Sequence, residues 1–257
     1  MYREVAPGAR LRSLVSSVWT FPRPRAERSH RVLPDGCMDI VVAGGRAMIV
    51  GSMRSAVCVP PMDEATLGIR MRPGEAERLF PGMAAELTDR DALLTDVWAD
   101  EGRRLEDALL ALLERATAAR HEAHSILRAA LPVVEDALVT RLSNRGVAAD
   151  VRTRAAAALL GEGRSVAAVA EHVGLSERQL ARRFFQRVGL SPKTYARVRR
   201  LQRAVLLLQR GATISAVAAD AGYADQPHFT REAKELAGAT PAVLVGEGSE
   251  TVVPVVL

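Results

Sequence analysis

Arginine and glutamine side chains recur at helical spacing between positions 178 and 186. Arg178, Arg182 and Gln186 fall on one face of a helix, with Gln179 beside them. Each of these side chains donates hydrogen bonds and none is acidic, whereas an ordinary solvated helix face usually mixes both signs of charge. Arginine can pair with guanine, and glutamine with adenine, in the major groove of DNA. This stripe, with the neighbouring Arg183, therefore favours recognition of a DNA duplex rather than catalysis.

The elements that must position this stripe are two short helices joined by a tight turn. Ser165 can cap the first helix, and Gly174 suits the left-handed conformation that ends it. Ser176 can cap the second helix, and Gln179 three residues later completes a capping box. Two helices that meet through a short turn containing glycine form a helix-turn-helix unit. The inward face of its second helix carries Leu180, Phe184 and Val188.

The same pattern returns 48 residues further along the chain. Thr213 can cap a short helix, Gly222 can end it, and a second reader helix begins near Asp225. The inward face of that helix carries Phe229, Ala233 and Leu236. Its outer surface carries Gln226, His228, Thr230 and Arg231, together with Glu235. Because the Glu235 carboxylate would repel phosphate, the second unit is predicted to hold DNA less firmly than the first.

A long helix is predicted between the two units. Ser191 can cap it, and proline is favoured in a first helical turn, where Pro192 stands. From Pro192 to Gln209 the helix would run about 27 Å at 1.5 Å per residue. That length can hold two compact units roughly one DNA turn apart, because successive major grooves lie about 34 Å apart. Four arginines of this helix are expected to add basic charge: Arg197, Arg199, Arg200 and Arg203.

Charge is segregated along the chain. Residues 1–150 hold 20 arginines against 21 acidic residues, whereas residues 151–246 hold 15 basic residues against 7 acidic ones. The overall net charge of +5 therefore belongs to the C-terminal segment. That asymmetry predicts a polyanionic partner for this segment alone. Biased codon usage could explain the preference for arginine over lysine, but it does not explain the segregation of sign.

The first 100 residues have the pattern of a β-rich domain, and helices follow. Helical periodicity begins at Leu105 and continues in a second stripe from Ile126 to Leu142, in which Pro132 is expected to kink or split the helix. These two helices could form a dimer seam or pack within one chain, and the sequence leaves both alternatives open. Short apolar or β-branched runs predict strands at Val15–Phe21, Met38–Val42, Ala47–Val50 and Thr66–Met71.

Other kinds of chemistry have less support. His121 and His124 have a spacing that suits metal ligands, but no third ligand is evident. Cys37, with His30 upstream, could form a reactive thiolate, but the ordinary explanation is an Asp-Gly turn that feeds a buried strand. The sequence has no glycine-rich phosphate loop and no nucleophile elbow. No catalytic residue, metal site or cofactor is therefore expected.

The location expected for the chain is the cytoplasm. No apolar run reaches the roughly 20 residues that span a bilayer, so no membrane partner is expected. The N-terminus opens with Tyr2, Arg3 and Glu4 and has no apolar signal core.

Several short motifs occur together in residues 151–244. In the first unit and the long helix they are Val166–Ala170, Gly174–Ser176, Leu180–Phe184, Gly189–Pro192, Tyr195, Arg200–Leu201 and Ala204. In the second unit they are Ile214–Ala221, Gly222–Tyr223, His228–Phe229, Arg231 and Gly238–Pro241. In combination this segment resembles the AraC/XylS family of transcription regulators. It departs from the family at Ala233, where a bulky aromatic residue is usual, and at Ala242–Leu244, where tyrosine and arginine are usual.

The resemblance implies DNA contacts from residues of both reader helices. In the first helix they are Arg178, Gln179 and Arg182, and in the second they are Gln226, His228, Thr230 and Arg231. Such regulators commonly pair the DNA-binding module with an N-terminal domain that binds an effector or dimerises. Residues 1–100 are similar, more loosely, to the short β-rich sensor domains found among them. The resemblance therefore implies a sequence-specific transcription regulator whose partner is double-stranded DNA.

The predicted fold class is α+β. A small, β-rich, barrel-like domain is expected at 1–100, a helical linker or dimerisation segment at 101–146, an all-α domain of two helix-turn-helix units at 147–246, and a tail at 247–257. A small-molecule effector, a second copy of the chain and RNA polymerase are further candidate partners. Shape and polarity single out six residues for an effector pocket: Trp19, Phe21, His30, Cys37, Asp39 and Trp98.

Two alternatives for the N-terminal domain stay open. It could only dimerise or contact partner proteins. Its two thiols, Cys37 and Cys58, could instead sense oxidants or electrophiles. Two cysteines are too few for a disulfide framework.

Overall fold

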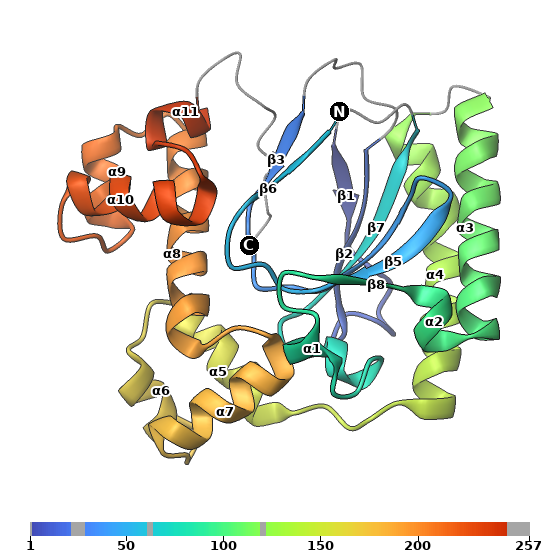
Figure 1. The fold of residues 1–257 in the computed structure, drawn as a ribbon, viewed down its shortest axis with the longest axis horizontal. Helices are drawn as coiled ribbons and strands as arrows, with labels where there is room; N and C mark the ends of the chain where they lie inside the picture. Colours follow the sequence, from blue (N-terminus) through green and yellow to red (C-terminus); the bar gives the residue numbers. More distant parts are fainter. Residues whose placement is uncertain (1, 22–28, 61–63, 119–121, 246–257) are drawn as a thin grey trace.

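The computed structural model describes residues 2–21, 29–60, 64–118 and 122–245. Strands come first along the chain and helices follow, and the C-terminal helices lie beside the sheet (Figure 1). The predicted α+β class is confirmed. His121 and the tail at 247–257 lie outside the described residues. None of the described helices is long and apolar enough to cross a membrane.

The N-terminal part is built on a six-stranded antiparallel sheet with the strand order β1-β2-β7-β4-β5-β8. Gly44 and Gly45 connect β4 and β5 through a two-residue turn, and both have the positive φ that such a hairpin requires. The strands of this sheet are β1 (Arg3–Val5), β2 (Val15–Phe21), β4 (Asp39–Ala43), β5 (Arg46–Val50), β7 (Thr66–Met71) and β8 (Asp91–Leu93). A separate antiparallel pair consists of β3 (His30–Val32) and β6 (Val57–Val59).

Two long helices cover the sheet, α3 (Asp100–Ala118) and α4 (Ala123–Arg145) (Figure 1). Their apolar stripes share one core with the strands, in which Leu109 and Leu138 are fully buried. Packing within one chain therefore accounts for these stripes, which leaves the predicted dimer seam without its main apolar residues. Helix α4 runs unbroken through Pro132, so the helix is not split there. Two short helical segments, η1 (Ala76–Arg78) and α1 (Met83–Glu86), lie between β7 and β8, and a third, α2 (Leu94–Trp98), leads from β8 into α3.

The C-terminal part holds two small helical units, one before and one after a long helix in the chain, α8 (Pro192–Gln209). The first unit consists of α5 (Val151–Gly161), α6 (Val166–His172) and α7 (Glu177–Val188). The second consists of α9 (Ile214–Asp220), α10 (Gln226–Ala237) and α11 (Pro241–Val245). Each unit has its own apolar core, and α8 contributes to both. The units therefore sit at the two ends of α8 (Figure 1).

Side-chain caps explain where these helices begin. At each N-cap a side-chain oxygen accepts a hydrogen bond from the backbone N–H three residues later, as predicted for Ser165, Ser176, Ser191 and Thr213. Asp225 caps α10 in the same way. The capping box of Ser176 is complete, because the side chain at position 179 also accepts from the Ser176 backbone N–H at 2.9 Å.

Candidate DNA-binding interface and adjoining cavity

The first reader helix, α7, presents its polar stripe to solvent. Leu180, Phe184 and Val188 are buried beneath it, in the core of the first unit. Arg178 and Arg182 are exposed, and neither side chain has a hydrogen bond or ion pair with any residue that the structure describes. Their guanidinium groups are therefore available to a partner outside the chain. Gln186 is exposed on the same helix.

Two other residues predicted to contact DNA are already engaged within the chain. The Gln179 carbonyl oxygen accepts the capping-box hydrogen bond, so this side chain is held at the helix N-terminus. The Arg183 guanidinium donates to Asp150 at 2.7 Å from Nε, and this hydrogen bond raises the pKa of Arg183. Its charge is thus partly compensated by Asp150, unlike the charges of Arg178 and Arg182.

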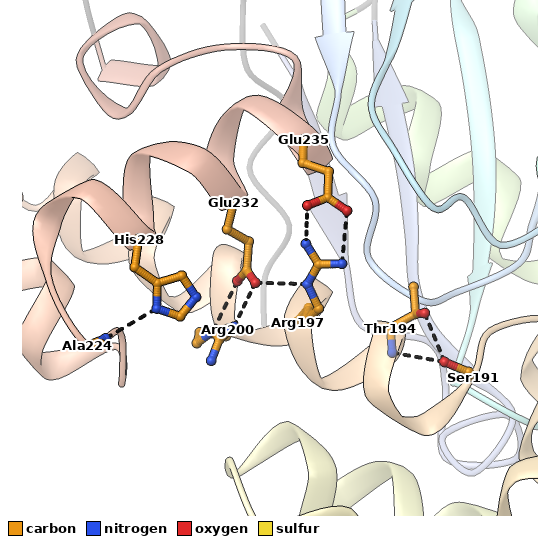
Figure 2. A network of polar contacts seen from close by, with 8 residues as sticks. All are labelled: Ser191, Thr194, Arg197, Arg200, Ala224, His228, Glu232 and Glu235. Atoms are coloured by element: carbon orange, nitrogen blue, oxygen red, sulfur yellow. Dashed lines mark hydrogen bonds and ion pairs between the residues drawn. The ribbon is translucent and has the colours of Figure 1, made fainter.

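The second reader helix, α10, is anchored by Phe229, Ala233 and Leu236, all of them buried as predicted. Gln226 and Arg231 are exposed. The Thr230 hydroxyl donates to the backbone carbonyl of position 226 at 3.0 Å, which occupies its proton within the helix. At the start of α10, Nδ1 of His228 accepts from the backbone N–H of Ala224 at 3.3 Å (Figure 2), which leaves Nε2 for an outside partner. The predicted residues are therefore placed at the N-terminal part of α10.

An ion-pair network fixes α10 to α8, as Figure 2 shows. Glu232 is buried, and its carboxylate accepts from Nε of Arg197 at 2.8 Å and from Nη2 of Arg200 at 2.6 Å. The exposed Glu235 pairs with the same Arg197 guanidinium. Burial raises the pKa of Glu232, but the hydrogen bonds from Arg200 and Arg197 outweigh burial and hold it below 4.5. The guanidinium of Arg200 also stacks over the ring of Tyr223, with 4.6 Å to the ring centroid.

This network corrects the expected role of the long helix. Arg197 and Arg200 were expected to add free basic charge, and Glu235 to repel phosphate. In the structure these charges neutralise one another, so they position the second unit rather than attract DNA. Arg203 also bonds within the chain, to the carbonyl of Gly161. A groove of about 850 Å³ between the two units retains exposed cations at its walls, namely Arg164, Lys193 and Arg231.

A cavity of about 720 Å³ opens in the N-terminal part. Five of the six residues predicted for a pocket line it: Trp19, Phe21, His30, Cys37 and Asp39. The sixth, Trp98, lies elsewhere. Its ring is buried in the core of the helical layer and stacks on Phe80, with 5.0 Å between ring centroids. The prediction of Trp98 as a pocket residue is therefore wrong.

Charged groups gather at the floor of this cavity. Arg70 is buried there, with its Nε 2.9 Å from Asp35 Oδ2 and 3.5 Å from Asp39 Oδ1. The other oxygen of Asp39 accepts from the indole N–H of Trp19 at 2.8 Å. Burial raises the pKa of Asp39 to about 6, although Arg70 opposes the shift. Sequence reasoning missed Tyr2, Asp35 and Arg70 as lining residues, because they come from segments that only the sheet brings together.

The cysteines have different surroundings. Cys37 is buried, and burial together with the nearby Asp35 raises the pKa of its thiol well above the ordinary value. A raised pKa disfavours the thiolate, which is the reactive form of cysteine. This environment argues against Cys37 as a sensing nucleophile. Cys58 is exposed.

Residues 169–245 match the helix-turn-helix domain family, and residues 3–92 match a family described as a domain of unknown function, DUF6597. The arabinose operon regulatory proteins of Escherichia coli K12 and Salmonella typhimurium are each 36% identical to this chain over 78 residues, which is 30% of the chain. A solved AraC-type regulator from Chromobacterium violaceum is 30% identical, over 37% of this chain and 88% of its own, with a TM-score of 0.35. By this C-terminal domain the chain belongs to the AraC family.

The sequence similarity to the arabinose operon regulatory proteins covers only part of each chain. The chain spans 27–28% of the length of the arabinose operon regulatory proteins that it matches. ToxT from Vibrio cholerae, solved with an unsaturated fatty acid, aligns with 97% of the chain at 10% identity and a TM-score of 0.46. That likeness is too slight to indicate a function.

One loop separates the cavity from the AraC-type domain. Residues 51–56 follow β5 and lead into β6, and Gly51, Met53 and Ser55 line the cavity. The alternate residues Ser52 and Ala56 bond instead to the AraC-type domain. Glycine is required at position 51, because a Cβ there would lie 1.7 Å from the carbonyl oxygen of Leu87.

The loop reaches the C-terminal ends of both reader helices. The Ser52 hydroxyl donates to the carbonyl oxygen of Val188, the last residue of α7, at 2.6 Å. The backbone N–H of Ala56 donates to the carbonyl oxygen of Leu236, near the end of α10, at 2.7 Å. These bonds satisfy carbonyl groups that a helix end leaves without a partner.

Further contacts join the N-terminal part to the AraC-type domain. Thr88 donates to the carbonyl of Gly189 at 2.7 Å, and Arg31 donates to the carbonyl of Ala237 at 2.7 Å. Gly36, with φ of +76°, lies against the ring of Tyr195 so closely that a Cβ would be 2.5 Å from Cε2. All these contacts fall at the C-terminal ends of the reader helices or along α8, so the N-terminal halves of the reader helices stay open to solvent.

Proposed function

We propose that this chain is a sequence-specific transcription regulator that reads a DNA duplex with α7 and α10. The observation that carries the proposal is the exposed, unpaired pair Arg178 and Arg182 on a helix whose opposite face is buried. Residues in the N-terminal half of a recognition helix reach base edges in the major groove. Both arginines lie in that half of α7.

The arrangement of the domain supports two contacts rather than one. The network around Glu232 fixes α10 to α8, and the first core fixes α7 to the other end of α8. Gln226, His228 and Arg231 would then contact a second stretch of the duplex. The cations Arg164 and Lys193, at the walls of the groove between the units, would face the phosphates in between.

We infer that a small molecule in the cavity regulates this binding. The loop 51–56 lines the cavity with one set of residues and bonds both reader helices with the alternate set. A ligand that displaces Met53 or Ser55 would therefore disturb the bonds to Val188 and Leu236. Such a ligand shifts DNA affinity only by the difference between its affinity for the chain with these bonds intact and its affinity for the chain with these bonds broken.

Dimerisation and contact with RNA polymerase stay predictions, and the cytoplasm is the location that a DNA partner favours.

Selection from random duplexes tests the DNA-binding part of the proposal. The full chain should enrich one sequence with two conserved elements separated by about one helical turn of 10–10.5 base pairs. Its affinity for that sequence should fall steeply and linearly on a log–log plot against salt, because phosphate contacts release counterions. Failure to enrich any sequence, or binding that does not depend on salt, would contradict the proposal.

Ser52→Ala tests the contact between the loop and α7. We expect it to reduce the free energy of unfolding by about 1–3 kcal/mol, because the buried carbonyl of Val188 loses its side-chain donor. Urea unfolding of the full chain measures this. Ser55→Ala is the matched control on the same loop, since Ser55 is exposed, and it should change stability by less than about 0.5 kcal/mol. Equal effects of the two variants would remove this contact as a route of regulation.

A further inference from the structure

The cavity floor holds more negative than positive charge. Three carboxylates, those of Glu4, Asp35 and Asp39, lie within 3.9 Å of a single guanidinium, that of Arg70. Asp35, Asp39 and Arg70 are buried, and the Glu4 side chain is only 15% exposed. Asp35, Asp39 and Arg70 line the cavity, whereas Glu4 contacts Arg70 from outside the lining. With all groups ionised, the floor therefore carries one uncompensated negative charge, and the Glu4 carboxylate adds a second one beside it. Buried charges are screened far less by water and salt than exposed ones.

The rim does not offset this excess. Arg46, Arg90 and Asp91 are exposed at the mouth, and Arg54 pairs with Asp89 there. Water and salt screen these charges from the floor. A ligand that reaches the floor therefore meets a site that favours positive charge.

Aromatic rings form one wall above the floor. Tyr2 lies 6.0 Å from Trp19 and 5.1 Å from Phe21, and Phe21 lies 5.1 Å from His30, measured between ring centroids. The faces of such rings attract cations as well as apolar groups. Burial lowers the pKa of His30, so this ring is neutral near pH 7.5 and does not oppose a cation. The remaining lining is largely aliphatic, with Val32, Val41, Met48, Val57 and Val59.

A second observation, a buried donor without a hydrogen-bond partner, points to a ligand at the floor. Arg70 is 5% exposed and lines the cavity, and its Nη1 atom lies 3.9 Å from Glu4 Oε2, too far for a hydrogen bond, with no hydrogen-bond acceptor among the described residues. Buried donors without partners are rare and costly in folded proteins. An acceptor atom on a ligand, or a water molecule held beside the ligand, would satisfy this donor.

We propose that the cavity binds an organic cation: a protonated amine on an aromatic or aliphatic body, with its ammonium group against Asp39 and Asp35. The body lies along the ring wall, and a volume of about 720 Å³ accommodates a molecule of ordinary metabolite size. An anion would meet the carboxylates of Asp35 and Asp39, and a neutral molecule would leave the negative charge of the floor unbalanced. The regulatory meaning of this site rests on the proposed function, but binding itself does not.

Two matched series of probes test the ligand class on the full chain. Each series keeps one body, phenyl or indole, and varies the head: 2-phenylethylamine, 2-phenylethanol and phenylacetate; tryptamine, tryptophol and indole-3-acetate. Calorimetry at pH 7.5 should show at least one amine binding about tenfold or more tightly than its alcohol, and its carboxylate binding more weakly still. The proposal is overturned if neither amine binds, or if an alcohol or carboxylate binds as tightly as its amine.

Asp39→Asn locates the charge contact. This variant should weaken amine binding about tenfold and leave alcohol binding unchanged, whereas Asp107→Asn, on the exposed surface of α3, should change neither. Melting curves show whether both variants fold, and the probe comparison on the unmodified chain requires no variant. Unchanged amine affinity in a folded Asp39→Asn variant would contradict the proposed placement.

The pH dependence gives a further readout. Trp19, Asp35 and Arg70 face Asp39 from β2, the loop before β4 and β7, and burial raises the pKa of Asp39 to about 6. Tyr2 and Cys37 also lie near Asp39, but burial raises the pKa of both, so they stay neutral over this interval. Asp39 is therefore ionised at pH 7.5 and mostly protonated at pH 5. Amine affinity should fall by up to about tenfold over this interval while alcohol affinity stays level. An amine affinity that rises toward pH 5 would contradict the contact.

DNA binding distinguishes this inference from the proposed function. If an amine binds the cavity but leaves affinity for the selected duplex unchanged, the ligand class stands and the regulatory part of the proposed function fails. If a carboxylate or alcohol binds best and changes DNA affinity, the regulatory part stands and the ligand class fails.

Discussion

Arg182→Ala is expected to weaken binding of the full chain to its selected duplex by about 5- to 150-fold, or about 1–3 kcal/mol. The guanidinium of Arg182 is exposed and has no hydrogen bond or ion pair with the residues that the structure describes, so the variant removes a contact to DNA rather than one within the chain. It should also relax discrimination at one base pair, because a bidentate arginine specifies guanine. Titration against single-base variants of the duplex measures both effects.

A matched control separates this contact from a general loss of charge. Arg115→Ala removes the same charge from an exposed site on α3, in the N-terminal part of the chain. It should change DNA affinity by less than twofold and leave the base preference intact. If Arg182→Ala binds every duplex as the unmodified chain does, α7 is not a reader helix.

Glu232→Gln is expected to destabilise the AraC-type domain by about 2–4 kcal/mol, which would be the largest loss of stability among the substitutions considered. Removing one partner of a buried ion pair typically costs about 3–5 kcal/mol, and water reaches part of Arg197 and Arg200, which lowers the cost. Because the folded-state pKa of Glu232 lies below 4.5, its contribution is present above pH 4.5 and is lost as pH falls through the lower folded value. Denaturant unfolding at pH 7 and at acid pH measures this.

Glu235→Gln provides the comparison on the same helix. Glu235 pairs with Arg197 as well, but its side chain is 63% exposed. Exposed ion pairs contribute about 0–1 kcal/mol, so this variant should unfold almost as the unmodified chain does. Equal losses from the two variants would mean that burial of Glu232 does not decide the strength of the network.

The helical part of the fold was predictable because its signals are local. Caps at Ser165, Ser176 and Thr213 and apolar stripes with helical spacing predicted the two units, and the long helix has the predicted bounds Pro192–Gln209. The strands Val15–Phe21 and Thr66–Met71 were predicted at their observed bounds, since six or seven residues suffice for a β pattern. The strands missed, such as Arg3–Val5 and Asp91–Leu93, have three residues each and depend on pairing partners.

The charged parts of both candidate sites were less predictable. Arg70 was not predicted to line the cavity, because β7 brings it to Asp35 and Asp39 only when the sheet forms. The pairing of Glu232 with α8 was missed for the same reason, although one signal was available: an acid that lies between Phe229 and Leu236 on an otherwise apolar face requires a partner. Trp98 was misplaced because its aromatic character does not distinguish a core from a pocket.

Hydroxyl-radical footprinting of the full chain on its selected duplex tests most directly that α7 and α10 both enter the duplex. We expect two protected segments on one face of the DNA, centred about one helical turn of 10–10.5 base pairs apart. Arg182→Ala should weaken only one of them. A single protected segment, or two that Arg182→Ala weakens equally, would contradict reading by two separate helices.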